Sequence, residues 1–226
     1  MFDFTLLILC AGYGKRMLDL TVDTPKPLLK IKNKTLLENT INFFTNIGCK
    51  EIFINTHFLH NKIENYISKY YKHYPINIIY EPLILGTGGG VKNIFKFTSN
   101  KNICVVNSDI FWSSENKLDI SNFLKDINNI TYCKILLSGY NNFHGLKKNI
   151  GDFNIQDGIV SKWYKGNDIF FYSGLQIVSK NIFDKTPKIF SMNEVWNKLI
   201  VNKNLSGTLI QSKILHIGDK KSFHNL

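Results

Sequence analysis

The sequence is nearly devoid of arginine and alanine and has no long hydrophobic run. Among its 226 residues, Arg16 is the only arginine and Ala11 is the only alanine. No apolar stretch approaches the roughly 20 residues of a membrane-spanning helix, so we expect no membrane segment. The first residues lack the basic start of a secretion signal, and a glycine-rich loop follows where a cleavage site would be needed. We therefore expect neither membrane insertion nor secretion.

Cysteine is also scarce, and its spacing argues against a metal-binding cysteine motif. The four cysteines lie singly in apolar stretches, at Cys10, Cys49, Cys104 and Cys133. We expect them to be buried, reduced thiols of a cytoplasmic protein. The composition, 44% hydrophobic and 20% charged, is that of an ordinary globular chain and argues against disorder.

Acidic residues are outnumbered, and the formal net charge is +11. The basic residues, nearly all of them lysines, are scattered along the chain rather than clustered. A nucleic-acid-binding protein would show basic clusters with interleaved aromatic residues, and only residues 70–74 do so. We interpret that stretch as the end of an amphipathic helix and most of the charge as solvated surface. We therefore predict no nucleic-acid partner.

Apolar runs and helical periodicity alternate through the first half of the chain. The predicted strands there cover 4–10, 51–55, 76–80 and 102–107, and the predicted helices cover 35–47, 61–74 and a glycine-initiated segment that continues over 91–97. The second half contains strands at 130–138, 152–156, 159–164, 169–179 and 207–217, and one helix over 191–201. This alternation predicts a mostly parallel sheet with helices on both faces. We expect one α/β domain over residues 1–226.

Capping signals support two of these helices. Thr35 and Glu38 form a predicted capping box at the first helix, and Gly48 is a natural stop after it. Ser191 and Glu194 open the last helix in the same way.

A glycine-rich segment, Ala11-Gly12-Tyr13-Gly14-Lys15-Arg16, follows the first predicted strand, where α/β sheets bind their ligands. Its small residues let the backbone approach a base or phosphate, and its two basic residues are suitable partners for a polyphosphate. The segment lacks the Walker A pattern, and Met17 stands where a dinucleotide fingerprint needs a small residue. Taken alone, it could also be an ordinary turn with a solvated basic pair.

Two further residues are candidates for phosphate and metal binding. Lys26 lies between Pro25 and Pro27, which stiffen the backbone and fix the direction of the lysine. Asp109 follows the apolar run 103–106, and carboxylate oxygens are the ligands that magnesium prefers. The alternatives are a surface lysine that contacts only water and an aspartate that caps a turn.

In combination, these segments resemble the signature of the sugar nucleotidylyltransferases, a Leu-x-Ala-Gly-x-Gly-x-Arg-Met loop followed by Pro-Lys-Pro-Leu. Further similarity lies at Glu81-Pro82, at Leu85 to Gly90 and at Val105 to Ile110. Residues 142–144, 151–153 and 173–174 make the chain most similar to N-acetylmuramate-1-phosphate uridylyltransferases of bacterial cell-wall recycling. The resemblance implies a Rossmann-like, three-layer α/β nucleotide-diphospho-sugar transferase fold with a mixed, mostly parallel central sheet.

The resemblance also implies a magnesium-dependent enzyme that transfers a nucleoside monophosphate from a nucleoside triphosphate to a sugar 1-phosphate and releases pyrophosphate. UTP and N-acetylmuramate 1-phosphate are the substrates it favours. The implied nucleotide-binding residues are Ala11, Gly12, Gly14, Lys15, Glu81, Gly86, Thr87 and Asn107. The implied catalytic residues are Arg16, Lys26 and Asp109, of which Asp109 would also hold Mg²⁺. The implied sugar-binding residues are Gly151, Ser173 and Gly174.

One departure from the family pattern concerns the second metal ligand. The family usually carries an Asp-x-Gly segment near the C-terminus, and the corresponding segment here reads His216-Ile217-Gly218-Asp219. His216 could coordinate the metal, Asp219 could reach it from a shifted position, or the site could rely on Asp109 and the substrate phosphates. Reduced activity or an altered metal preference would follow.

Other functions share parts of the same signature. Guanylyltransferases for mannose or heptose 1-phosphate share the Gly-Thr-Gly loop, and phosphocholine cytidylyltransferases share the front half. A catalytically degenerate nucleotide-sugar-binding protein is a third alternative. The retention of Arg16, Lys26 and Asp109 favours an enzyme. We expect a cytoplasmic monomer or simple homodimer.

Overall fold

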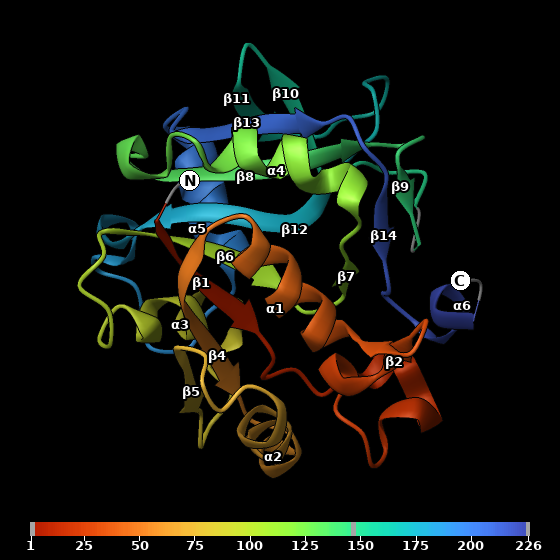
Figure 1. The fold of residues 1–226 in the computed structure, drawn as a ribbon. Coiled ribbons are helices and arrows are strands. Elements are labelled where there is room, and N and C mark those ends of the chain that lie inside the picture. Colours follow the sequence, from red (N-terminus) through yellow and green to blue (C-terminus); the bar gives the residue numbers. More distant parts are fainter. Residues whose placement is uncertain (1–2, 146–147, 225–226) are drawn as a thin grey trace.

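The computed structural model describes residues 3–145 and 148–224. Its centre is a nine-stranded sheet with the strand order β10-β11-β13-β8-β12-β6-β1-β4-β5 (Figure 1). In chain order these strands are β1 (Phe4–Leu9), β4 (Cys49–Thr56), β5 (Ile76–Tyr80), β6 (Asn102–Asn107), β8 (Cys133–Gly139), β10 (Phe153–Gln156), β11 (Ile159–Lys162), β12 (Phe170–Ser179) and β13 (Leu205–Ile210).

Two small sheets and six α-helices complete the described fold. One small sheet contains β7 (Ile110–Phe111), β14 (Ile214–His216) and β9 (Phe143–His144), and the other contains β2 (Lys30–Ile31) and β3 (Lys34–Thr35). The helices are α1 (Leu36–Asn46), α2 (His60–Tyr70), α3 (Gly86–Ile94), α4 (Lys117–Leu124), α5 (Met192–Val201) and α6 (Lys220–His224). Across the described residues, no helix is both long enough and apolar enough to cross a membrane.

In the central sheet, the four strands from the first half of the chain run parallel. β1 pairs with β4 on one side and with β6 on the other, and β5 lies beyond β4. β12 then enters antiparallel between β6 and β8, and β11 runs antiparallel to β13. The central sheet is therefore mixed: seven of its nine strands run in one direction, and β11 and β12 run in the other. The carboxyl ends of β1, β4 and β6 meet at one edge.

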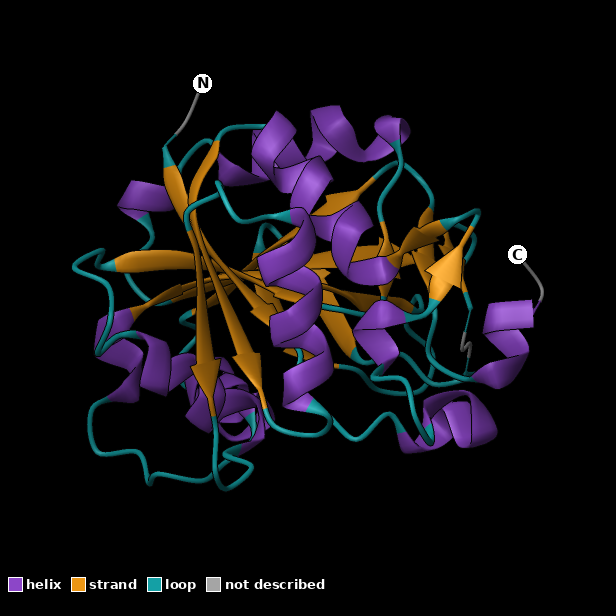
Figure 2. Cartoon of the chain, turned by 60° about the horizontal axis from the view of Figure 1, so that its bottom comes forward, coloured by secondary structure: helices purple, strands orange, loops and turns teal. Residues whose placement is uncertain are grey.

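Helices lie on both sides of this sheet, as Figure 2 shows, and the fold has three layers. In β1, Leu6 and Ile8 belong to a hydrophobic cluster that includes residues of α1, α2 and α4, whereas Leu7 belongs to a cluster with α3 and α5. Successive strand residues point to opposite faces, so one strand serves both clusters. All three side chains are fully buried, and truncating one to alanine would cost about 2–5 kcal/mol of stability. The three-layer α/β fold expected from the sequence is confirmed.

The predicted capping boxes form fully at one helix and partly at the other. At α5, the Ser191 and Glu194 side chains each bond to the backbone of the other residue. At α1, the Thr35 hydroxyl accepts a hydrogen bond from the Glu38 N–H at 2.9 Å. The Glu38 carboxylate instead accepts from the Tyr66 hydroxyl of α2 at 3.1 Å, so it joins two helices rather than closing the box.

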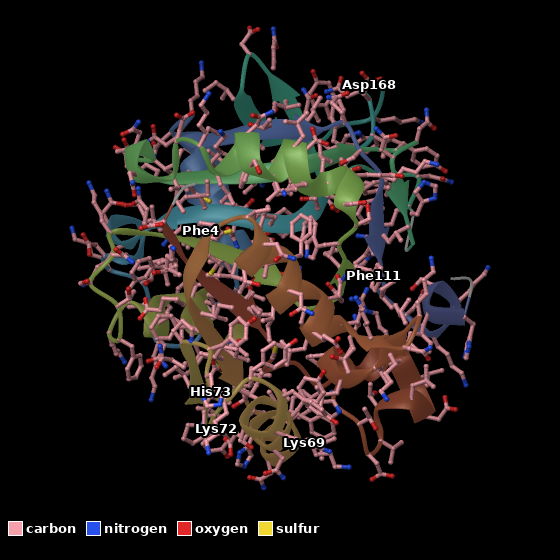
Figure 3. All side chains as sticks on the ribbon, viewed as in Figure 1. Phe4, Lys69, Lys72, His73, Phe111 and Asp168 are labelled. Carbon is pink, nitrogen blue, oxygen red and sulfur yellow. The ribbon has the colours of Figure 1, made fainter. Side chains whose placement is uncertain are left out.

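The helix predicted over 61–74 ends earlier, at Tyr70. Tyr71 departs from helical geometry and its ring turns inward, leaving the residue 7% exposed. A turn then joins Tyr71 to Tyr74, whose N–H donates to the Tyr71 carbonyl at 2.9 Å. The side chains of Lys69 and His73 lie in the region around the end of α2 (Figure 3). The aromatic and basic stretch is thus the end of an amphipathic helix and the turn after it.

The strand predicted over 207–217 is in fact two strands in two different sheets. β13 belongs to the central sheet and β14 to the small sheet with β7 and β9. Between them, the N–H groups of Gln211 and Ser212 donate to the Asp119 carboxylate of α4, at 3.3 and 2.8 Å. A side chain therefore satisfies the backbone at the break, and the chain is free to leave the central sheet and bring His216 next to β7.

Candidate active site

A cavity of about 390 Å³ opens at the carboxyl ends of β1, β4 and β6. This is the edge at which open α/β sheets bind ligands. Eleven of the sequence-predicted site residues line it, namely Ala11, Gly12, Gly14, Lys15, Arg16, Lys26, Glu81, Gly86, Thr87, Asn107 and Asp109. The other lining residues are Leu9, Cys10, Pro27, Asn55, Ile84, Ser108 and Gly218.

The first glycine loop is held against the Pro-Lys-Pro segment. Gly14 has a φ of 66°, and a Cβ atom there would lie 3.1 Å from the Thr21 side chain and 3.3 Å from Lys26 Cβ. The Thr21 hydroxyl donates to the Gly14 carbonyl at 3.1 Å. A left-handed conformation and a close approach both favour glycine here. The loop thereby presents Lys15 and Arg16, both exposed, at the cavity.

The second glycine cluster has a largely structural role. The N–H groups of Gly88 and Gly89 both donate to the Phe190 carbonyl, at 3.0 and 3.2 Å. A Cβ atom on Gly88 would lie 2.3 Å from the Phe190 ring, so only glycine permits this approach. Within the cluster, only Gly86 and Thr87 line the cavity, at the N-terminus of α3, where backbone N–H groups favour anions. The Thr87 hydroxyl also accepts from the Met192 N–H at 2.9 Å.

A buried polar chain connects the two glycine loops. The Cys10 N–H donates to Asn55 Oδ1 at 2.9 Å, and Asn55 Nδ2 donates to Glu81 Oε1 at 2.8 Å. Glu81 Oε2 accepts from the Leu85 N–H at 3.1 Å. Asn55 and Glu81 are only 3% and 2% exposed, so this chain sets the spacing of the loops from inside. Both Glu81 oxygens are thus engaged by the protein, while the residue still forms part of the cavity wall.

His57 ties the tip of the first loop to the same region. Its Nδ1–H donates to the Glu81 carbonyl at 2.6 Å, and its Nε2 lies 3.2 Å from the Tyr13 hydroxyl. Neither His57 nor Asn55 was predicted from the sequence as a site residue. The available signal was that Asn55 follows the apolar run 52–54, as Asn107 follows 103–106, at the end of a neighbouring strand.

Asp109 and Lys26 form an ion pair at the floor of the cavity. Lys26 Nζ donates to Asp109 Oδ2 at 2.7 Å, and the two side chains are 11% and 15% exposed. Burial alone would raise the pKa of the Asp109 carboxyl, but the neighbouring Lys26 and His216 outweigh it and hold the pKa well below its ordinary value. Asp109 is therefore a carboxylate at neutral pH.

His216 reaches the same carboxylate from β14. Pairing of β14 with β7 places His216 opposite Ile110, and His216 Nε2 lies 3.4 Å from Asp109 Oδ2. Asp219, the other residue considered for this role, is engaged elsewhere. Its Oδ1 accepts from the Ser222 N–H at 2.7 Å at the start of α6. Of the two, the structure brings His216 and not Asp219 into contact with Asp109.

The donor atoms around Asp109 suit a hard divalent cation that receives further ligands from a substrate. Asp109 Oδ1 is buried and, within the described residues, has no hydrogen-bond partner. Such an atom is costly to bury unless something binds it. The described residues contain no group of three or more His, Cys, Asp or Glu side chains that could hold a metal by itself. Asp109, with His216 beside it, would therefore need phosphate and water oxygens to complete a magnesium shell.

The predicted sugar-binding residues do not line this cavity. Gly151 lies in a second cavity of about 520 Å³, whose aromatic lining residues are Phe153, Trp163, Tyr172 and Trp196. Ser173 is fully buried, and its hydroxyl donates to the Leu136 carbonyl at 2.8 Å.

Gly174 has a packing role beside Ser173. It has a φ of 85°, and a Cβ atom there would lie 2.7 Å from the Ile110 side chain. Glycine at this position lets β12 pass close to β7. The Ser173 side chain and Gly174 thus have packing roles in this structure.

Comparison with known proteins identifies the family. Residues 5–138, more than half of the chain, match the family model described as nucleotidyl transferase. The chain therefore belongs to the nucleotidyl transferase family and is an enzyme of the nucleotidyltransferase class.

Two of the curated relatives are D-glycero-alpha-D-manno-heptose 1-phosphate guanylyltransferases. The protein from Aneurinibacillus thermoaerophilus is 33% identical over 46% of this chain and 45% of its own length, so that match spans less than half of the relative. The protein from Campylobacter jejuni is 28% identical over 79% of this chain and 77% of its own length. The N-acetylmuramate alpha-1-phosphate uridylyltransferase of Caulobacter vibrioides is 25% identical over 96% of this chain and 92% of its own length.

A solved structure supports the fold. The crystal structure of HddC from Yersinia pseudotuberculosis complexed with GMP-PN superposes with a TM-score of 0.77, covering 98% of this chain and 97% of that one at 22% identity. At this identity the likeness establishes the α/β nucleotidyltransferase fold and nothing further about the substrate.

Proposed function

We propose that this protein transfers a nucleoside monophosphate from a nucleoside triphosphate to a sugar 1-phosphate and releases pyrophosphate. The observation that carries the proposal is the Lys26–Asp109 pair, 2.7 Å apart, at the floor of a cavity lined by Lys15, Arg16 and small loop residues. The buried, unpartnered Asp109 Oδ1 supports a role for this carboxylate beyond the ion pair. The relatives of this chain include a heptose 1-phosphate guanylyltransferase and an N-acetylmuramate 1-phosphate uridylyltransferase, and both names describe this class of reaction.

The chemistry requires positioning and charge neutralisation rather than a side-chain nucleophile. A phosphate oxygen of the sugar 1-phosphate attacks the α-phosphorus, and the bond from that phosphorus to the oxygen of the β-phosphate breaks. The electron pair leaves with pyrophosphate. Lys15 and Arg16 bind the triphosphate from the exposed side of the cavity, and Lys26 neutralises charge that develops where the two substrates meet.

Magnesium would supply further charge neutralisation when bound with the nucleotide. Asp109 would hold it through the carboxylate oxygens, with His216 next to it. Ala11, Gly12, Gly86 and Thr87 line the cavity with backbone and small side chains, which would contact the base and the ribose.

The second cavity is the proposed place for the sugar. Asn193, which lines it, follows Met192, whose N–H donates to the Thr87 hydroxyl at the first cavity, so residues that line the two cavities lie close together. Gly151 lies under the Trp163 ring, which approaches to 2.5 Å of where a Cβ atom would be. A lining of aromatic and amide side chains suits the apolar and hydroxyl-bearing faces of a sugar. Gly151 is the sugar-binding residue that this arrangement supports, whereas Ser173 and Gly174 would contribute only through the backbone.

Two substrate pairs are supported by different observations. UTP with N-acetylmuramate 1-phosphate agrees with the alignment to the uridylyltransferase over 96% of this chain. GTP with a heptose or mannose 1-phosphate is supported at least as well, because the Campylobacter guanylyltransferase is 28% identical over 79% of the chain. The first experiment therefore compares nucleoside triphosphates that differ in the base and sugar 1-phosphates that differ in the sugar.

The test is pyrophosphate release by the purified protein with magnesium. UTP, GTP, CTP and dTTP would each be paired with N-acetylmuramate, mannose, glucose, N-acetylglucosamine and heptose 1-phosphates. We expect release with one base and one sugar class, and a loss of about 100-fold or more in Asp109→Ala. Lys165→Ala, outside both cavities, is the matched control and should retain the rate. No release with any pair, despite nucleotide binding, would favour a nucleotide-sugar-binding protein instead.

A further inference from the structure

We propose that the Lys26 ammonium group takes the place of a metal ion at the Asp109 carboxylate. A divalent metal then binds this carboxylate well only when a bound nucleotide draws Lys26 away. The inference rests on the proposed function, because it assumes that metal and triphosphate meet at this cavity. It concerns the order in which the site fills, and not the identity of the base or the sugar.

The geometry at Asp109 carries the first step of the inference. Lys26 Nζ lies 2.7 Å from Oδ2, and His216 Nε2 lies 3.4 Å from the same oxygen. With the Lys26 side chain 11% exposed and that of Asp109 15% exposed, water screens this contact much less than it would a surface ion pair. A metal bound to Asp109 would share one carboxylate with a full positive charge. Repulsion between two cations on a single carboxylate opposes metal binding for as long as Lys26 stays in place.

The backbone of Lys26 is fixed, but its side chain can move from Asp109 to a bound triphosphate. Pro25 and Pro27 flank it, and Gly14 approaches so closely that a Cβ atom on that glycine would lie 3.3 Å from Lys26 Cβ. Beyond that point the lysine has a flexible stem with a terminal ammonium. Lys15 and Arg16 line the same cavity and attract a polyphosphate to it. A bound triphosphate gives the Lys26 ammonium a new anionic partner and releases Asp109 for the metal.

This exchange makes metal and nucleotide mutually dependent. Bound nucleotide draws Lys26 away from Asp109 and so favours metal binding. Bound metal favours nucleotide binding by the same factor, because such coupling is reciprocal by thermodynamic linkage. In the free protein, Lys26 neutralises a carboxylate that would otherwise be buried without a counter-ion. His216 stays beside the carboxylate in either state, because β14 pairing with β7 holds it there.

The experiment measures Mn²⁺ binding by electron paramagnetic resonance, with Mn²⁺ alone and no nucleotide. Lys26→Gln should bind Mn²⁺ at least about tenfold more tightly than the wild type, because it removes a full charge in contact with the ligand. Lys26→Arg should stay as weak as the wild type. Lys15→Gln, the matched control, removes one charge from the same cavity without touching Asp109, and should change the affinity less than about threefold.

A second neutral variant of Lys26 and a double variant with Asp109→Asn serve as controls. Lys26→Met replaces Lys26→Gln if circular dichroism shows that the latter is unfolded. Adding Asp109→Asn to the neutral Lys26 variant should abolish the gain, which locates the binding at this carboxylate. If the neutral variant binds Mn²⁺ no more tightly than Lys15→Gln, the inference is wrong even if pyrophosphate release is observed. The binding measurement needs no turnover, so it stands apart from a failure of the proposed function.

Discussion

Asp109 is the residue at which the charged groups of the cavity meet, because Lys26 Nζ and His216 Nε2 lie 2.7 and 3.4 Å from its Oδ2 atom. The motif around Lys26 and the strand end at Asp109 are each visible along the chain, but their contact joins residues 83 positions apart. The same holds for His216, whose place beside Asp109 depends on a strand break at residues 211–213. Local patterns predict which residues are exceptional, and the tertiary fold decides which of them touch.

His216 provides a prediction at this scale about metal preference. An imidazole nitrogen suits Mn²⁺ better than Mg²⁺, whereas a carboxylate suits Mg²⁺. In pyrophosphate-release titrations with each metal, His216→Asp should therefore require less Mg²⁺ for half-maximal rate than the wild type. Its Mn²⁺ requirement should change less.

Asp219→Asn is the control, because the Asp219 carboxylate accepts a hydrogen bond from the Ser222 N–H at the start of α6 and does not contact Asp109. Equal Mg²⁺ requirements in the wild type and His216→Asp would count against a role for His216 at the metal.

Elements in this fold are positioned by glycine contacts as much as by hydrophobic faces. α3 approaches the segment before α5 so closely that a Cβ atom on Gly86, Gly88 or Gly89 would lie within 2.6 Å of Lys188 or Phe190. Of this cluster, the family resemblance implies a nucleotide-binding role for Gly86 and Thr87. Glycine-rich segments favour both phosphate loops and tight helix packing, and a sequence pattern alone does not separate the two.

Gly89→Ala tests the packing role of this cluster. A Cβ atom at Gly89 would lie 2.4 Å from the Lys188 carbonyl oxygen, so the backbone would have to shift. We expect a loss of about 1–3 kcal/mol in the free energy of unfolding, measured by denaturant titration. Gly139→Ala is the matched control, since a Cβ atom there would meet nothing within 4 Å beyond its chain neighbours, and its stability should change by less than about 0.5 kcal/mol. Equal stability of the two variants would show that α3 can adjust without cost.

At the scale of the whole molecule, the alternation of strands and helices predicted the three-layer architecture. The pattern succeeded because β1, β4, β5 and β6 are short apolar runs separated by amphipathic helices. It did not reveal the strand order, the antiparallel insertion of β12 or the polar chain through Asn55 and Glu81. Those features depend on pairing between distant segments, which no local period encodes.

The thiols provide a prediction for the intact molecule. All four cysteines are buried, as expected from the sequence, and burial raises the pKa of Cys10, Cys49 and Cys133 to about 12. Cys104 is shifted in the same direction. Because the thiolate is the reactive form, the folded protein at pH 8 should react very slowly with a disulfide reagent such as DTNB. All four thiols should react at once in guanidinium chloride, and fast reaction of any thiol in the native protein would contradict this burial.

The position of β12 has a consequence for how the chain is made. Until residues 175–179 emerge from the ribosome, the 102–107 strand has a neighbour on only one side, and its other edge carries unpaired backbone groups. This apolar edge, at the middle of the future sheet, therefore stays unpaired while about 70 further residues are synthesised. An unpaired strand edge can pair with other chains and so promotes aggregation. Protection of this edge from aggregation thus comes late in translation, at one antiparallel pairing, before α5, β13 and β14 complete the fold.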